Sequence, residues 1–291
     1  MTARLLRSWL FLPADNERFA ARALTGDADA VILDLEDAVA DRSKAAARAG
    51  AARHTGDAGN AARHLYVRIN ALDTPHALAD VTAVVGPGLE GIVLPMAGRA
   101  ADVEILDWLL TQAEHAGGLP VGRTAVVPLV ECAAGVVRMG EIARASTRIR
   151  TLAYGSGDLA ADVGMPWEAT GSGDIGVRSL LALHCRDAGI GPPLDSVSMA
   201  IDDEDALRAE AHRSRDLGFG GKLCVHPRQV ATINETYLPS AARVEWAHRI
   251  IAATDEAEAR GAGAVRLDGQ LMDIATIESA RRILDLVAAA R

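Results

Sequence analysis

Short apolar runs recur along the chain at a fairly steady interval, and most are continuous rather than alternating with polar residues. Continuous runs rich in β-branched residues are typical of strands that are buried on both faces of a parallel sheet. The runs are Trp9–Leu12, Ala30–Leu35, Leu65–Ile69, Gly91–Leu94, Ala125–Val130, Thr151–Tyr154, Ser196–Met199 and Lys222–Val225. The pattern therefore predicts eight strands.

Alanine-rich segments with helical spacing lie between these runs. Asp102–Ala116 is one, and Asp203–Leu217, which opens on acidic residues suited to a helix N-terminus, is another. Strands that alternate with helices predict parallel βαβ units, and eight such units favour a closed (β/α)8 barrel of the TIM type. The alternative, an open doubly wound sheet, usually has fewer strands and a glycine-rich first turn, and no G-x-G-x-x-G follows Pro13.

The end of the chain exceeds what a barrel needs. We predict that residues 1–236 form the barrel and that residues 237–291 form a helical extension. Helices are expected over Ala241–Arg260 and Ile274–Ala290, joined by a glycine-containing loop, Gly261–Asp273. Such a tail has two uses, which are to cover the bottom of the barrel or to reach a neighbouring subunit.

Composition and charge exclude some classes of function. The 291 residues are 49% hydrophobic, enough for the core of one α/β barrel, and the net charge of -9 argues against nucleic acid and anionic membranes as partners. Cys132, Cys185 and Cys224 form no CxxC pattern, so we expect a reduced, cytoplasmic compartment, with Cys132 and Cys224 as small apolar fillers. The start holds too short an apolar run for a secretory signal, and no run approaches the ~20 residues of a membrane span.

Chemistry in an α/β barrel takes place where the strands end, so the residues after each apolar run are the candidates for the site. They are Asp15, then Asp34, Glu36 and Asp37, then Arg68 and Asn70, then Glu131, Asp158 and His226. Carboxylates from several strands would repel one another at one mouth, and a divalent cation is the simplest neutraliser. Carboxylate ligation without His or Cys suits a hard ion, Mg²⁺ above all.

Each candidate also has an interpretation without chemistry. Glu131, directly after a buried run, would be poorly placed as a surface charge, so we favour a function for it. Asp158 is as well explained as the N-cap of a helix that starts at Leu159. Arg68 is either a simple ion-pair partner or a clamp for a carboxylate, and the clamp is more usual at the end of a buried strand. His226 is equally well explained as a core histidine.

The acids Asp34, Glu36 and Asp37 carry the same ambiguity. One of them is expected to pair with Arg68 for structural reasons, and the others stay candidates for the site.

Seven motifs extend these observations. They are RSWLFLP at 7–13, DAVILDLEDAV at 29–39, YVRIN at 66–70, GIVLP at 91–95, PLVE at 128–131, GSGD at 155–158 and GFGGKLCVHP at 218–227. Together they resemble the citrate lyase β-subunit-like proteins of the HpcH/HpaI aldolase superfamily of coenzyme A ester lyases. The resemblance runs from about residue 7 to about residue 290, and the motifs are specific as a set.

The resemblance implies a (β/α)8 barrel that commonly forms a trimer. It implies that Glu131 and Asp158 bind Mg²⁺ and that Arg68 contacts the carboxylate and the enolate of the substrate. It also implies that Leu267–Asp273 is a loop that delivers a catalytic aspartate, Asp273, into the site of a neighbouring subunit. Arg68, Glu131 and Asp273 are therefore the expected catalytic residues.

Further positions follow from the same resemblance. Arg18 and Arg22 match basic positions that face the phosphates of coenzyme A. The residues expected to line the substrate, beside Arg68 and Glu131, are Phe11, Asp37, Val225 and His226.

Three departures from the family pattern concern the substrate. Met96 stands where many relatives carry Lys, Cys132 replaces a usual Thr, and Ala14 replaces a usual Gly. None of these positions is an expected metal ligand, so they bear on the acyl group more than on the reaction class.

The expected function is a Mg²⁺-dependent lyase that cleaves malyl-, β-methylmalyl- or citramalyl-CoA into a small 2-oxo acid and an acyl-CoA. The alternatives are a malyl-CoA thioesterase and a citrate lyase β-subunit that acts on a citryl-carrier protein. An aldolase for free hydroxy-oxo acids is disfavoured by Arg18, Arg22 and the Asp273 loop, because a free acid needs no phosphate contacts.

Overall fold

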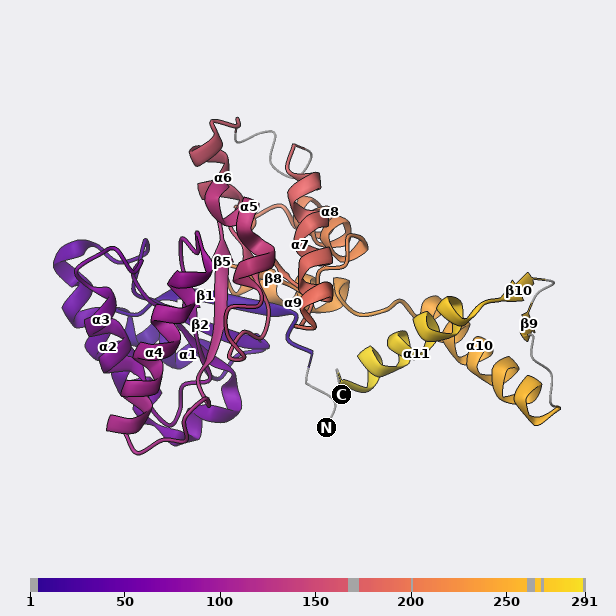
Figure 1. Ribbon diagram of the computed structural model, residues 1–291, viewed down its shortest axis with the longest axis horizontal. Helices are drawn as coiled ribbons and strands as arrows, with labels where there is room; N and C mark the ends of the chain where they lie inside the picture. The colour runs from indigo at the N-terminus through magenta and orange to yellow at the C-terminus, as the bar shows by residue number, and fades with distance from the viewer. Residues whose placement is uncertain (1–4, 167–172, 200, 261–264, 268–269, 290–291) are drawn as a thin grey trace. The chain divides into compact units, whose positions relative to one another are not determined.

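The computed structural model of the chain describes residues 5–166, 173–199, 201–260, 265–267 and 270–289. The chain divides into two compact units, and Figure 1 labels most of their helices and several of their strands. One unit is Leu6–Asn234, and the other consists of Leu5 and the C-terminal segment from Glu235 onward.

The first unit is built on a closed barrel of eight strands that follow one another in chain order. The strands are β1 (Ser8–Pro13), β2 (Ala30–Asp34), β3 (Leu65–Arg68), β4 (Gly91–Leu94), β5 (Ala125–Val130), β6 (Ala153–Tyr154), β7 (Leu194–Asp195) and β8 (Gly221–Cys224). Every neighbouring pair is parallel, and β8 closes the barrel against β1, where Leu10 lies opposite Cys224. The predicted (β/α)8 barrel is confirmed.

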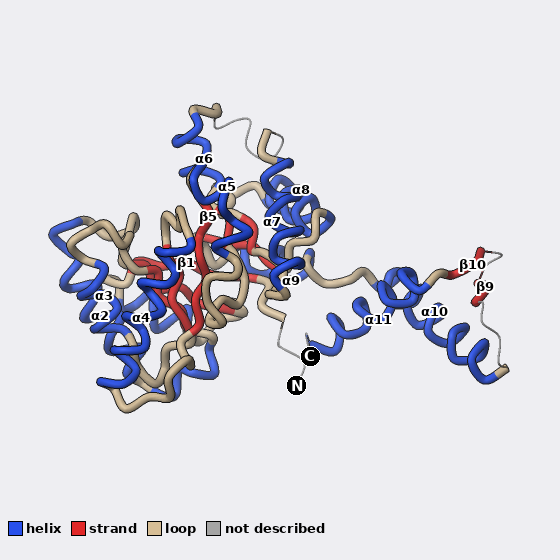
Figure 2. The backbone as a smooth tube through the Cα atoms, viewed as in Figure 1, coloured by secondary structure: helices blue, strands red, loops and turns tan. Residues whose placement is uncertain are grey.

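Helices surround this barrel, as the blue and red tubes of Figure 2 show. They are α1 (Glu17–Ala23), α2 (Lys44–Gly56), α3 (Ala77–Val84), α4 (Ala100–Ala116), α5 (Ala133–Ile142), α6 (Ser156–Val163), α7 (Ile175–Ala188), α8 (Glu204–Asp216) and α9 (Arg228–Thr236), with 3-10 turns η1 (Asp41–Ser43) and η2 (Ala58–Arg63). The predicted helices over Asp102–Ala116 and Asp203–Leu217 correspond to α4 and α8. Within the described residues, no helix combines the length and the apolar character needed to cross a membrane.

The seventh strand lies earlier than predicted. Ser196–Met199 was expected to be the strand, but β7 is Leu194–Asp195 and those residues follow it. The prediction was wrong because the charge of Asp195 interrupts the apolar pattern. In the fold this carboxylate is buried and accepts a hydrogen bond from Lys222 Nζ on β8 at 2.7 Å, which lets an acid occupy a strand.

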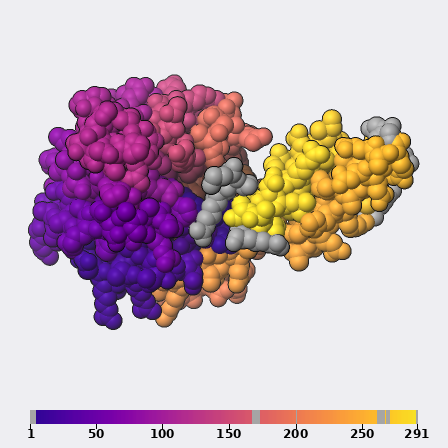
Figure 3. All heavy atoms as spheres, turned by 90° about the horizontal axis from the view of Figure 1, so that it is seen from below, coloured from indigo at the N-terminus to yellow at the C-terminus, as the bar shows by residue number. Residues whose placement is uncertain are grey.

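The second unit has a small core of its own. Its helices α10 (Ala241–Ala259) and α11 (Ile274–Ala289) pack against each other, and they appear as orange and yellow atoms in Figure 3. The buried contacts are made by Ala247, Ile250, Ala280 and Ile283.

The segment between these two helices is not a plain loop. β9 (Val265–Leu267) and β10 (Gln270–Met272) pair as antiparallel strands within it. The glycines in the segment favoured a loop, whereas the strands are only three residues long and give no periodic signal. The expected loop positions 261–264 and 268–269, and the expected helix end at 290, lie outside the described residues.

Candidate active site

Three charged side chains lie at the mouth of the barrel because side chains alternate between the two faces along each strand. Asp34 and Arg68 are the last residues of β2 and β3, and Glu131 directly follows β5. Each lies two residues beyond a member of the buried cluster that fills the barrel. Because strand side chains alternate between faces, all three point to the inside at the carboxyl ends of their strands. This is the end of an α/β barrel that carries active sites.

The Arg68 guanidinium lies among acids from β2 and the loop after it. Its Nε and Nη2 donate to the two carboxylate oxygens of Asp34, at 2.7 and 2.6 Å. Its Nη1 lies 2.8 Å from Glu36 Oε2 and 3.3 Å from Asp37 Oδ2. The guanidinium carbon also lies 4.9 Å from the centre of the Phe11 ring, on β1. Three acids therefore face Arg68, where one was expected.

Glu36 forms an ion pair with Arg68, yet its carboxyl has a raised pKa. Its Oε2 is close to Arg68 but forms no hydrogen bond, because the contact has the distance of an ion pair without the required angle. Burial raises the pKa of Glu36 to about 7, against the attraction of Arg68 and with the support of the negative charges of Asp37, Asp34 and Asp158. The group as a whole holds more negative charge than one arginine compensates.

Glu131 is almost entirely buried, with 3% of the residue exposed. Its Oε1 accepts a hydrogen bond from the backbone N–H of Met96 at 2.8 Å. Met96 has a φ of 51°, in the left-handed region that residues other than glycine seldom occupy, and this turn aims its amide at the carboxylate. Burial raises the pKa of Glu131 well above its usual range, and the charges of Glu36 and Asp158 add to the effect.

Asp158 reaches the same region from α6. It lies in the first turn of this helix and is exposed, and the alternative in which it is the N-cap is wrong, because Gly155 occupies that position. Gly155 packs directly on Glu131, since a Cβ atom at position 155 would lie 2.5 Å from Glu131 Oε2. Asp158 is close enough to Glu131 and Glu36 for its charge to raise the pKa of both carboxyls.

This arrangement fits a hard divalent cation held by Glu131 and Asp158. The Glu131 carboxylate is buried beside the negative charges of Glu36 and Asp158, and carboxylate oxygens are the ligands that Mg²⁺ prefers. Among the described residues, no three or more His, Cys, Asp or Glu side chains are arranged to hold a metal ion by themselves. Mg²⁺ itself commonly takes one or two protein carboxylates and completes its shell with water and substrate.

The two arginines expected to face coenzyme A lie on α1, directly after β1. Arg18 and Arg22 are both exposed and are spaced by four residues, so they share one face of the helix. Within the part of the chain that the structure describes, neither guanidinium has a hydrogen bond or ion pair. Both are therefore free to bind an anion.

The loop after β8 is fixed by a buried amide. Gln229 Oε1 accepts from the backbone N–H groups of Val225 and His226 at 3.0 and 3.1 Å, and its Nε2 donates to the Ser198 carbonyl at 2.9 Å. Val225 is exposed, as a residue that lines a substrate must be. His226 is half-buried rather than in the core, and its Nδ1 accepts from the Arg228 N–H at 3.2 Å.

Asp273 belongs to the second unit. It is exposed, and its Oδ1 accepts from the N–H and the hydroxyl of Thr276 at 2.7 and 2.6 Å, so it caps the start of α11. These hydrogen bonds lower the pKa of Asp273.

Other candidates have structural roles. Asn70 is buried and donates through Nδ2 to Asp80 at 2.6 Å. Cys132 caps α5, where its Sγ accepts from the Gly135 N–H at 3.4 Å, and Cys224 is fully buried. Asp15 is exposed at the end of β1.

Sequence reasoning missed the groups that act through the backbone or through one amide. The Met96 N–H and the Gln229 side chain are the main examples, because neither residue type marks a site by itself. The one usable signal was the GSGD motif, whose first glycine proves to be the contact of Glu131.

With this geometry in view, the comparisons with known proteins are decisive about the family. Residues 7–227 match the family model described as HpcH/HpaI aldolase/citrate lyase. The chain belongs to this family. A family member from Rhodobacter capsulatus, L-malyl-CoA/beta-methylmalyl-CoA lyase, is 38% identical over 97% of this chain and 94% of its own length. Citrate lyase subunit beta from Leuconostoc mesenteroides is 35% identical over 98% of this chain and 94% of its own length.

Solved structures from the family share the architecture. CitE from Mycobacterium tuberculosis, crystallised with magnesium, acetoacetate and coenzyme A, is 32% identical and superposes with a TM-score of 0.79 over 99% of this chain and all of that one. The same protein crystallised with magnesium and pyruvate has a TM-score of 0.70 over 96% of this chain and 97% of that one, at 30% identity.

Proposed function

We propose that the protein is a Mg²⁺-dependent carbon–carbon lyase that cleaves a malyl-CoA-like thioester, such as malyl-, β-methylmalyl- or citramalyl-CoA, into a 2-oxo acid and an acyl-CoA. The observation that carries the proposal is the buried Glu131 carboxylate, which meets Asp158 and the Arg68 cluster at the mouth of the barrel. Membership of the family, the malyl-CoA lyase relative and the relative solved with magnesium and coenzyme A support it.

Glu131 and Asp158 are the proposed metal ligands. Bound Mg²⁺ would polarise the hydroxyl and carboxylate oxygens of the substrate and make the hydroxyl more acidic. The Gly155 contact and the Met96 amide hold the Glu131 carboxylate in one orientation for this purpose.

Arg68 is proposed to stabilise the negative charge that develops on the thioester enolate. Burial opposes its charge, but the hydrogen bonds to Asp34 and the negative charges of Asp34, Glu36 and Asp37 together outweigh burial and raise the pKa of Arg68, so the guanidinium stays ionised. Fixed positive charge aimed at a developing anion is usually the largest contribution to catalysis. Phe11 covers the guanidinium on one side and limits the approach of water.

Asp273 is proposed as the acid–base residue. In cleavage, the Asp273 carboxylate accepts the proton of the substrate hydroxyl, the C–C bond breaks, and its electron pair passes into the thioester enolate. Asp273 then gives that proton to the enolate carbon, and in the reverse direction the same proton moves back from the carbon to the hydroxyl oxygen through Asp273. We propose that Asp273 serves a neighbouring subunit, in a homotrimer or a multiple of one, and that residues 237–291 act as an extension for this contact.

The remaining positions are proposed to hold the thioester. Arg18 and Arg22 would bind the phosphates of coenzyme A, and the acyl group would be lined by Phe11, Asp37, Val225 and His226. We place the protein in the cytoplasm, since its three cysteines are buried and unpaired, as in a reducing compartment.

The test is to incubate the purified chain with Mg²⁺ and each of the three thioesters, and to follow carbonyl release with phenylhydrazine together with thiol release. A lyase yields carbonyl without thiol. Glu131→Ala should abolish Mg²⁺-dependent turnover while the barrel stays folded, and Glu141→Ala, which removes an exposed acid on α5, should leave turnover unchanged. Full activity of Glu131→Ala would overturn the metal assignment.

The same assay separates the other candidate functions. A thioesterase would release thiol without carbonyl. A citrate lyase β-subunit, which the Leuconostoc relative favours, would turn over a citryl-carrier protein and none of the free thioesters.

A further inference from the structure

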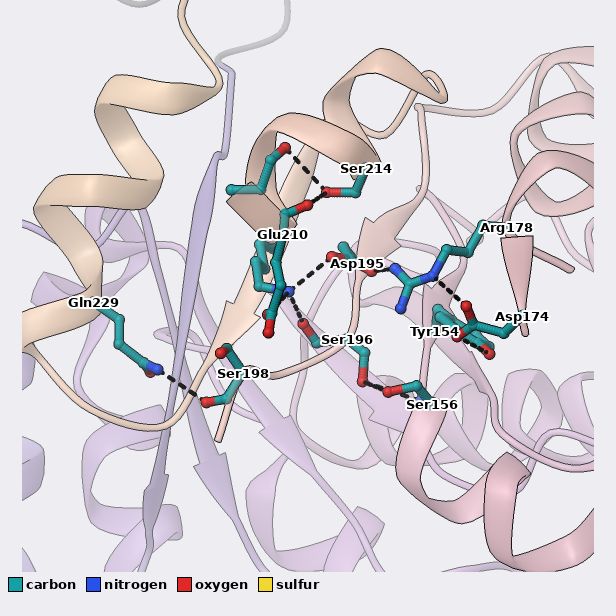
Figure 4. A network of polar contacts seen from close by, with 12 residues as sticks. Tyr154, Ser156, Asp174, Arg178, Asp195, Ser196, Ser198, Glu210, Ser214 and Gln229 are labelled. Carbon is teal, nitrogen blue, oxygen red and sulfur yellow. Dashed lines mark hydrogen bonds and ion pairs between the residues drawn. The ribbon is translucent and has the colours of Figure 1, made fainter. Parts of the chain in front are cut away.

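The hydroxyl of Ser196, just after β7, holds the start of α6, the helix that carries Asp158. Ser196 directly follows β7, and its Oγ accepts from the Ser156 backbone N–H at 3.0 Å and from the Ser156 hydroxyl at 2.8 Å. Both serines are buried, with 4% or less of each exposed. Figure 4 shows these two side chains pointing toward one another between β7 and α6.

This contact replaces a cap that α6 does not supply itself. The first N–H groups of a helix have no partner within the helix and are usually satisfied by the side chain of the N-cap residue. The N-cap of α6 is Gly155, which has no side chain and makes no such bond. Ser196, which follows β7, therefore caps α6 at Ser156. Ser156 lies two residues before Asp158 and next to Gly155, the glycine that packs on Glu131.

Ser196 is itself held by buried charges on the outer side of the strands. Lys222 Nζ donates to the Ser196 carbonyl at 2.8 Å and to Asp195 Oδ2 at 2.7 Å, and it lies 3.4 Å from Glu210 Oε2. Asp195 also pairs with Arg178, on α7. Figure 4 labels Asp195, Arg178 and Glu210 of this network, above the two serines in the view.

Such a network is better suited to fixing a position than to adding stability. Buried ion pairs contribute little net stability, because the loss of hydration offsets the attraction, and in some proteins they instead restrain their partners to one geometry. Here the restrained partner is the backbone of Ser196, whose hydroxyl then has a fixed place opposite α6.

We propose that Ser196 is a positioning residue for the metal site, acting through Ser156 on Asp158. The inference rests on the proposed function, since it assumes that Asp158 is a ligand of Mg²⁺. Mg²⁺ demands near-octahedral geometry at short distances, so a small rotation of the first turn of α6 moves a ligand out of range. Groups that orient metal ligands typically contribute about ten- to a hundred-fold to metal affinity.

The experiment compares Ser196→Ala with Ser8→Ala in the full chain. Ser8 is also fully buried, and its Oγ accepts from the Asp29 backbone N–H at 3.1 Å, at the opposite end of the barrel. Mn²⁺ binding is measured directly by electron paramagnetic resonance as a stand-in for Mg²⁺, and thermal unfolding is measured in parallel. Ser196→Ala should bind Mn²⁺ at least about ten-fold more weakly, with kcat at saturating metal largely kept, and Ser8→Ala should bind it like the wild type.

Two further variants separate positioning from general damage. Ser196→Thr keeps the hydroxyl and should restore Mn²⁺ affinity. Ser156→Ala removes one of the two bonds and should weaken binding by less, with no additional loss when combined with Ser196→Ala. The comparison of Ser156→Ala with the double variant tests the positioning role even if the methyl group added by Ser196→Thr does not fit.

The outcomes distinguish this inference from the proposed function. Wild-type affinity in folded Ser196→Ala, or equal weakening in Ser8→Ala, overturns the positioning role alone. Absence of Mn²⁺ binding in the wild-type chain overturns the metal assignment and with it the proposed function.

Discussion

Gly155→Ala should disable the proposed metal site by steric overlap alone. The backbone at this position has φ −111° and ψ 91°, which any residue adopts, so the change adds only a methyl group. That methyl would lie 2.5 Å from Glu131 Oε2 and 2.6 Å from Glu131 Cβ. Ordinary contact begins at 3.4 Å, so each atom must retreat by roughly 0.8–0.9 Å.

The Cβ contact makes the overlap costly. A carboxylate can rotate away, but Glu131 Cβ moves only with the end of β5 or with α6, and such overpacking costs about 1–3 kcal/mol. For a chain of this size, that corresponds to a fall in Tm of roughly 2–12 °C. A carboxylate displaced by nearly 1 Å no longer meets the geometry of Mg²⁺, so metal affinity should fall at least about a hundred-fold.

The assay is calorimetric unfolding together with Mn²⁺ binding, and the control is Gly86→Ala. A Cβ atom at Gly86 would lie 2.6 Å from the Thr55 carbonyl, an equal overlap ahead of β4 at the other end of the barrel. The control should lose stability and keep its metal affinity. The reasoning fails if Gly155→Ala binds Mn²⁺ within about two-fold of the control.

Three further predictions concern buried charges. Arg68→Lys keeps the charge but not the two-pronged contact with Asp34, so kcat/KM with malyl-CoA should fall by at least about a hundred-fold; an unchanged value would remove Arg68 from the chemistry. Asp195→Asn removes the buried carboxylate that Lys222 and Arg178 share and leaves Lys222 with only the more distant Glu210, so denaturant unfolding should show a loss of about 3–5 kcal/mol. Folding raises the pKa of Glu36 from 4.5 to about 7, so this carboxyl destabilises the metal-free protein progressively as pH rises through that range. The free energy of unfolding of Glu36→Gln should therefore rise relative to that of the wild type by up to roughly 3 kcal/mol between pH 4.5 and 7. A difference that does not change with pH would contradict the shift.

The strands that the sequence predicted best are those whose residues are apolar on both faces. β4 and β5 match the expected runs residue for residue, because nothing charged interrupts them. β7 was misplaced because Asp195 is buried by ion pairs, and a single sequence carries no sign that a distant lysine will compensate it. The hairpin of β9 and β10 was missed since its strands are too short to show a period.

The residues of the candidate site also differ in how well the sequence predicts them. The rule that chemistry lies at strand ends selected Arg68 and Glu131, and these side chains do point into one mouth. Contacts that depend on loop conformation were beyond sequence reasoning. The left-handed turn at Met96 and the capping of α6 by Ser196 involve residue types that occur everywhere, and only the folded backbone brings them to the carboxylates.

The main-chain contact between position 96 and Glu131 has a consequence for how this enzyme class diversifies. Because the peptide N–H makes the bond, the side chain at position 96 is free to change without altering the contact to Glu131, the proposed metal ligand, provided that the residue tolerates a positive φ. Met96 is 46% exposed at the mouth. Substitutions at position 96 can therefore change the preference for the acyl group without changing the reaction. Gly, Asn and Asp are the residues that tolerate its positive φ with the least strain.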